Sequence, residues 1–129
     1  MKDKTENLDR MLVDAAAQLV SIIAIDLTVM AESIRRGGPD AMITNECTGG
    51  LIDEFVVRAE RLQCAADVRG MARSSGALLE LTDDLVNLGN HVRDLRSARP
   101  GRLSPADRRA RVLELITALV DGCTRGRYL

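Results

Sequence analysis

Residues 78–95 read LLELTDDLVNLGNHVRDL, a stretch in which apolar side chains recur at alternating spacings of three and four residues. The six are Leu78, Leu81, Leu85, Leu88, Val92 and Leu95. This spacing is typical of a helix that packs along its length against other helices. The same spacing recurs in a second stretch, at Ile52, Phe55, Ala59, Leu62 and Ala66. A looser version runs through a third, at Leu12, Ala16, Leu19, Ile23, Leu27, Met30 and Ile34.

The first half of the chain is expected to form two main helices. The first should begin near residue 5 and end before the Gly-Gly-Pro sequence at residues 37–39. Residues 39–47 could form a short extra helix, since proline is tolerated in a first turn. The Thr-Gly-Gly sequence at residues 48–50 is expected to end that helix. The second main helix then covers residues 51–68.

The second half is expected to contain the other two main helices. Residues 69–76 indicate a turn or a kinked continuation, with Ser74 or Ser75 as the cap of a helix that extends to residue 95. Ser104 is the expected cap of the last helix, because Pro105 follows at the first helical position and Asp107 lies three residues on. That helix should bury Val112, Leu115, Ile116, Leu119, Val120 and Cys123. The sequence therefore predicts an all-α, up-and-down bundle of four main helices, in one domain spanning residues 1–129.

Composition restricts both the core and the compartment. Aromatic residues make up 2% of the 129 residues, namely Phe55 and Tyr128, so the core must be aliphatic. This scarcity counts against binding of single-stranded nucleic acid, which usually needs aromatic side chains for base stacking. The three cysteines form no Cys-x-x-Cys pair, which favours neither a disulfide framework nor a zinc site. The longest charge-free run of the first helix, residues 15–25, is shorter than the roughly 20 residues of a membrane span. We therefore expect a cytoplasmic protein without a membrane partner.

The first helix is apolar on more than one face. Val20, Ile22, Ile25 and Val29 lie outside its main stripe, yet all four are hydrophobic. A peripheral bundle helix needs only one apolar stripe. The helix is therefore either surrounded by the others or shared with a second protein. These four residues are a candidate apolar interface, either with another protein or in a homodimer.

Charge is segregated along the chain. By count, residues 1–90 carry nine basic and 15 acidic side chains, whereas residues 91–129 carry nine basic and four acidic ones. The candidate partner-binding cations are Arg93, Arg96, Arg99, Arg102, Arg108, Arg109 and Arg111. Arginine binds both carboxylates and phosphates through two parallel hydrogen bonds. This basic end could therefore contact an acidic protein or, alternatively, a nucleic-acid backbone, or it could simply be a solvated face whose arginines pair with nearby acids.

Oxygen ligands and one imidazole share the opposite face of the 78–95 helix, at Glu80, Asp83, Asp84, Asn87, His91 and Asp94. They would be the site of a small metal-dependent enzyme if this face lined a cleft. Metal sites in bundles normally face the interior and draw ligands from several helices, whereas this face should point to water. No nucleophilic triad, phosphate-binding loop or cofactor motif accompanies it.

The sequence favours function through helix surfaces rather than through chemistry. The expected role is a non-enzymatic protein-binding module, such as an adaptor, inhibitor or regulatory subunit, with no cofactor and no resident metal. A nucleic-acid accessory protein that uses residues 93–111 is the first alternative. A small metal-dependent enzyme that uses residues 80–94 is the second.

Overall fold

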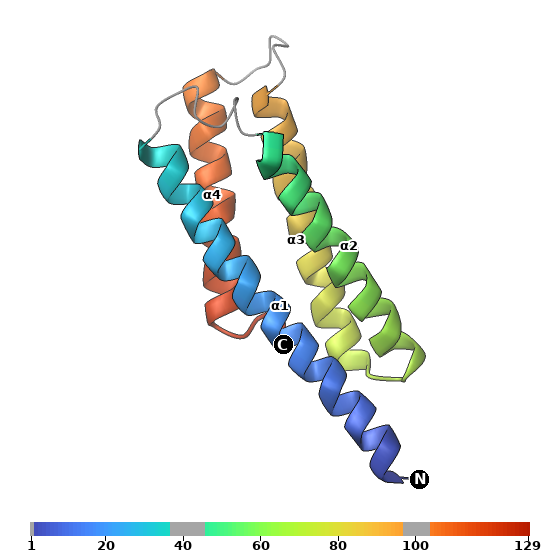
Figure 1. The fold of residues 1–129 in the computed structure, drawn as a ribbon. Helices are drawn as coiled ribbons and strands as arrows, with labels where there is room; N and C mark the ends of the chain where they lie inside the picture. The colour runs from blue at the N-terminus through green and yellow to red at the C-terminus, as the bar shows by residue number, and fades with distance from the viewer. Residues whose placement is uncertain (1, 37–45, 97–103) are drawn as a thin grey trace.

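The computed structural model describes residues 2–36, 46–96 and 104–129, and these form four helices. They are α1 (Lys2–Arg36), α2 (Glu46–Val68), α3 (Ala72–Arg96) and α4 (Pro105–Thr124). Successive helices run in alternating directions, and no strand occurs in the described part of the chain (Figure 1). The predicted all-α, up-and-down bundle of four main helices is confirmed.

The four helices close into a ring around one aliphatic core. α2 packs along α3, α1 packs along α4, and the two pairs meet through α1 with α2 and α3 with α4. The predicted stripes face this core: Leu78, Leu81, Leu85, Leu88 and Val92 of α3 are all at most 1% exposed. Burial of such side chains stabilises a protein by about 1.5–3 kcal/mol each relative to their exposure to water. Packing of these stripes therefore supplies most of the stability of the helices in the bundle.

The start of α2 differs from the sequence prediction. Residues 48–50 were expected to separate two helices, but α2 begins at Glu46 and continues through Gly49 and Gly50. Glycine in a helix costs about 1 kcal/mol relative to alanine. Ile52 and Phe55, which follow at once, are fully buried, and their packing outweighs that local cost. Residues 39–45 of the expected short helix lie outside the described residues, and residues 46 and 47 belong to α2.

The connection between α2 and α3 is shorter than the sequence suggested. Gly70 adopts a positive φ of 72°, and its N–H donates to the carbonyl of Asp67. The Met71 N–H donates to the carbonyl of Ala66. This pair of bonds is a Schellman motif, which favours glycine at the left-handed position. α3 begins directly afterwards at Ala72, so Ser75 lies inside the helix rather than at its cap, and its hydroxyl accepts a hydrogen bond from Gln63.

The start of α4 agrees with the prediction. The Ser104 hydroxyl accepts a 3.1 Å hydrogen bond from the Asp107 N–H, and Pro105 occupies the first turn. Asp107 also lies in the first turn, where a negative charge interacts favourably with the helix dipole.

The C-terminal tail, residues 125–129, folds back from α4 onto α3. Tyr128 is 1% exposed, and its hydroxyl donates a 2.6 Å hydrogen bond to Asp84. The Arg127 guanidinium donates to Glu80 at 2.8 Å. A Cβ atom at Gly122 would lie only 3.0 Å from the Tyr128 ring. The tail can therefore pack here because residue 122 has no side chain.

α1 is much longer than α4, with 35 residues against 20, and its N-terminal part extends beyond the end of α4 (Figure 1). Asp9 in this part forms an ion pair with Arg69 at the α2–α3 connection. Val13 is 44% exposed, whereas Val20, seven residues later on the same side of the helix, is buried. The N-terminal part of α1 is therefore held at the end of the bundle but covered less fully than the rest.

Candidate protein-docking surface on α1

α1 carries a second apolar stripe in addition to the one that faces the core. Its positions alternate at spacings of three and four residues over three heptads, and we call this set the outer seam. It consists of six apolar residues and one polar residue, Gln18; the apolar ones are Leu8, Met11, Ala15, Ile22, Ile25 and Val29. At 100° per residue, the centre of the outer seam lies about 130° around the helix from the centre of the buried face. The outer seam therefore faces away from the bundle.

Most of the outer seam is exposed. Met11, Ile25 and Val29 have 63–65% of their surface exposed, Leu8 has 50% and Ile22 has 39%. Gln18 is exposed as well, and Ala15 is half-buried. Single exposed apolar side chains are common on protein surfaces, but a row of them along one helix marks a candidate contact surface.

Of the four residues predicted to form an apolar interface, three are exposed and one is buried, and their contact with a partner stays a prediction. Ile22, Ile25 and Val29 are exposed, whereas Val20 is 4% exposed and belongs to the core. Val20 lies four residues after Ala16 and three before Ile23, both of which are buried. α1 packs against both α2 and α4, so its buried sector is wider than a single stripe and includes Val20.

The sequence prediction missed the N-terminal part of the outer seam. Leu8 and Met11 continue the same spacing, but they stand among Glu6, Asp9 and Asp14, which made this part look like an ordinary polar helix start. The alternating spacing from residue 8 to residue 29 was the signal that could have revealed them.

The predicted basic end is only partly described, and two of its four described arginines form ion pairs with acids of the same chain. Arg93 donates to Asp53 at 2.6 Å, and Arg111 donates to Glu114 at 3.1 Å. Arg108 and Arg109 are half-buried in the first turns of α4. The pairing of Arg111 with Glu114 is what its sequence neighbourhood suggested, while Asp53 is a partner from a different helix. The side chains of Arg96, Arg99 and Arg102 lie outside the described residues.

The acidic face of α3 is partly occupied by the C-terminal tail. Glu80 accepts from Arg127 and Asp84 accepts from Tyr128, as described above. Among the described residues, no three His, Cys, Asp or Glu side chains are grouped so that they could hold a metal ion. His91 is half-buried, and the Asp94 side chain is not among those described.

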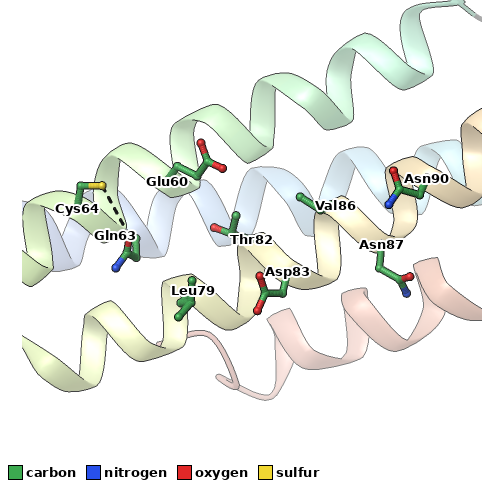
Figure 2. A pocket seen from close by; sticks show the side chains of 9 residues that line it. All are labelled: Glu60, Gln63, Cys64, Leu79, Thr82, Asp83, Val86, Asn87 and Asn90. Carbon is green, nitrogen blue, oxygen red and sulfur yellow. Dashed lines mark hydrogen bonds between the residues drawn. The ribbon is translucent and has the colours of Figure 1, made fainter.

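A shallow groove of about 500 Å³ lies between the outer faces of α2 and α3 (Figure 2). Thr82 is buried, and its hydroxyl donates to the Leu78 carbonyl. The Cys64 thiol donates to the Gln63 amide oxygen at 3.7 Å. Most of the side chains that line the groove are polar; the lining residues are Glu60, Gln63, Cys64, Leu79, Thr82, Asp83, Val86, Asn87 and Asn90. Its polar groups come from both walls and do not converge on one point in Figure 2.

Burial changes the acidity of two groups near the end of α4. It raises the pKa of the Cys123 thiol from 9.0 to about 11, so this thiol is protonated at neutral pH. Burial, followed by the hydrogen bond to Asp84, raises the pKa of Tyr128 well above its usual value of 10.0. Neither group is poised as a nucleophile or base at neutral pH, which is consistent with a structural role for this region.

By length and composition alone, the α1 segment Glu6–Arg36 could cross a membrane. One helix of this kind near an N-terminus is weak evidence for a span, because core helices of soluble proteins have the same properties. The sequence argument against a span counted only the charge-free residues 15–25. The segment Glu6–Arg36 is longer than that run, and it qualifies although up to two charged residues lie in its most apolar part.

No protein-family model, no curated protein and no solved structure matches the chain.

Proposed function

We propose that this chain is a non-enzymatic protein-binding module, an adaptor, inhibitor or regulatory subunit, that holds its partner on the outer seam of α1. The observation that carries this proposal is the row of exposed apolar side chains from Leu8 to Val29 on a helix whose other face is already buried. Removing such side chains from water is favourable by about 25 cal/mol for each Å² of apolar surface. Burial of this row against a partner would therefore stabilise the complex.

The spacing of the seam defines the shape of the partner. Alternating spacings of three and four residues keep side chains aligned with a second helix as the two wind around each other. Three heptads correspond to about 32 Å of helix at 1.5 Å per residue. We expect the partner to present an amphipathic helix of similar length.

The outer seam is a stronger candidate than the other two surfaces. Arg93 and Arg111 are already paired with acids of the same chain. Glu80 and Asp84 are engaged by the C-terminal tail. Apart from Gln18, the exposed seam side chains are apolar, and contact with another apolar surface is what would remove them from water favourably.

Site-specific photocrosslinking in the native cell tests this proposal. A photoreactive amino acid would replace Ile25 in the seam or, as a matched control, Thr117 on the exposed face of α4. We expect position 25 to give a discrete covalent adduct with a protein and position 117 to give none. Mass spectrometry would identify the protein in the adduct.

Two results would contradict the proposal. One is the absence of any protein adduct from position 25. The other is the same set of adducts from positions 25 and 117, which would mean that the seam is no more a contact surface than the rest of the molecule.

A further inference from the structure

We propose that the partner of the outer seam is an amphipathic helix of another protein that carries basic side chains on both edges of its apolar stripe. This inference rests on the proposed protein-binding function and names the chemistry of the partner. Three features of the seam support it: the charges at its edges, one amide near its middle and its small area.

The charged side chains at the edges of the outer seam are both acidic. Residues 8–29, the span of the seam, contain four charged side chains. Two of them, Asp9 and Arg10, lie more than about 100° around the helix from the centre of the seam. Asp14 lies about 70° from that centre on one side, and Asp26 lies about 50° from it on the other. Charged side chains at such edge positions pair across two packed helices.

Asp14 and Asp26 are both available to a partner. Each is exposed, and neither forms an ion pair within the described part of the chain. By contrast, Glu32, just beyond the seam, is paired with Arg35 and Arg36. The two edge carboxylates can therefore receive basic side chains at two points about 18 Å apart along α1.

This charge pattern separates the occupants that an apolar row could have. A second copy of the chain would bring the same two acidic edges, so full overlap of two seams supplies no complementary charge. A membrane surface rich in anionic lipid would be repelled by both carboxylates. A helix with lysine or arginine on its edges, in contrast, places opposite charges on both sides of its apolar contact with the seam.

Gln18 requires a polar position in the partner as well. It is exposed near the middle of the seam, and its amide has no hydrogen-bond partner among the described side chains. Covering an amide with apolar surface alone is costly. We therefore expect a polar side chain opposite Gln18, which a protein helix can supply and lipid acyl chains cannot. One polar residue in an apolar seam also fixes the register of two packed helices.

The outer seam alone is a small contact. A strip about 32 Å long and about 10 Å wide covers about 320 Å² of α1. Stable, specific interfaces bury about 1,200–2,000 Å² in total, so a helix that sits on this strip alone binds weakly. Two edge charges are then a sizeable share of the binding, and covalent trapping suits the complex better than purification.

Photocrosslinking from position 25 in the native cell tests the role of the edges. The variant Asp14→Asn/Asp26→Asn removes both edge charges and leaves the apolar side chains unchanged. The matched control Glu54→Gln/Asp83→Asn removes two exposed carboxylates of α2 and α3 that form no ion pair within the described residues. We expect the yield of the adduct to fall about three- to tenfold in the edge variant and to stay unchanged in the control.

Charge reversal sharpens the test. Asp14→Lys/Asp26→Lys should lower the yield further than the asparagine variant, because like charges then face each other. Circular dichroism of the purified variants would verify that the helices are intact. The trapped protein, identified by mass spectrometry, should contain an amphipathic helix with basic residues on both edges, about 12 residues apart.

An adduct yield that is unchanged in the edge variant, or that falls equally in the control, would overturn the inference. So would a trapped protein without basic edges, including a second copy of this chain. In each of these cases the adduct still supports the proposed function.

Absence of any adduct from position 25 in the wild type contradicts the proposed function, and the inference fails with it. A lipid partner would be revealed by flotation of the purified chain with vesicles of phosphatidylcholine and phosphatidylglycerol. If the chain floats and Ile25→Lys/Val29→Lys does not, the seam binds lipid and both proposals fail.

Discussion

Gly122 fixes the position of the C-terminal tail because it has no side chain. Its backbone faces the Tyr128 ring, and an added Cβ would lie 3.0–3.2 Å from three ring and hydroxyl atoms. Gly89, inside α3, is buried as well. At Gly89 the nearest atom is the Ile52 Cγ2, 3.4 Å from an added Cβ, which is an ordinary contact with a side chain. Gly122 and Gly89 therefore differ in what an added methyl group would contact.

The variants Gly122→Ala and Gly89→Ala should change stability in opposite directions. Alanine is favoured over glycine in a helix by about 1 kcal/mol. At Gly89 this gain should appear almost in full as a higher free energy of unfolding. At Gly122 the Tyr128 ring must move and its bond to Asp84 is lost, so we expect a net loss of about 1–3 kcal/mol.

Urea unfolding followed by circular dichroism would measure both variants. A Gly122→Ala protein as stable as Gly89→Ala would mean that the tail is not packed against α4 as described.

At the scale of the elements, the buried apolar stripes and the start of α4 could be predicted from the sequence, whereas the start of α2 and the connection between α2 and α3 could not. Periodicity located all four helices, since each buries a row of apolar side chains against its neighbours. It placed the start of α2 too late, because the local cost of Gly49 and Gly50 is outweighed by packing that only the tertiary structure reveals. The contact of Tyr128 with Asp84 was missed because it joins residues 44 positions apart, without periodicity to indicate it.

The end of α4 and the tail should make the fold sensitive to alkaline pH. The unfolded Cys123 thiol loses its proton near pH 9.0, whereas the folded one keeps it up to about 11. Between these values the unfolded state binds fewer protons, so the stability that is complete below pH 9 is lost as the pH rises towards 11. Tyr128, whose pKa is also raised, adds a loss of the same sign that begins near pH 10.

Urea midpoints at pH 8, 9.5 and 10.5 would test this expectation. The decline should be shallower in Cys123→Ala, by up to about 1.4 kcal/mol per pH unit for the one thiol. Cys64→Ala, at an exposed thiol, serves as the control and should retain the wild-type decline. An unchanged slope in Cys123→Ala would exclude the buried thiol as its source.

At the scale of the whole molecule, only part of the candidate docking surface could be predicted from the sequence. The surplus of apolar residues on α1 indicated a shared face, and three of its residues lie on the outer seam. Whether a given residue of that helix faced a neighbour or water could not be decided without knowing that both α2 and α4 pack against it, which is why Val20 was misplaced.

The basic end gives a prediction for nucleic acid. The whole chain carries a formal charge of −1, and two of the described arginines of this end are paired with acids. Phosphate binding would need these arginines to exchange their partners. We therefore expect no binding of a labelled DNA duplex at about 150 mM salt, the physiological ionic strength.

Fluorescence polarisation across salt concentrations would check this, with Arg108→Ala/Arg109→Ala/Arg111→Ala as the comparison. Tight binding that weakens steeply with salt and is lost in the triple variant would contradict this expectation and would indicate that the protein binds nucleic acid.

The packing of Tyr128 also has a spectroscopic consequence. It is the only tyrosine of a chain that contains no tryptophan, so ultraviolet emission from the protein comes almost entirely from this one ring. The ring is buried and its hydroxyl is bonded to a carboxylate, which places the fluorophore in an environment that it loses when the tail detaches. The molecule thus contains an intrinsic optical reporter at the junction of α3, α4 and the tail, and detachment of the tail can be followed without attaching a dye.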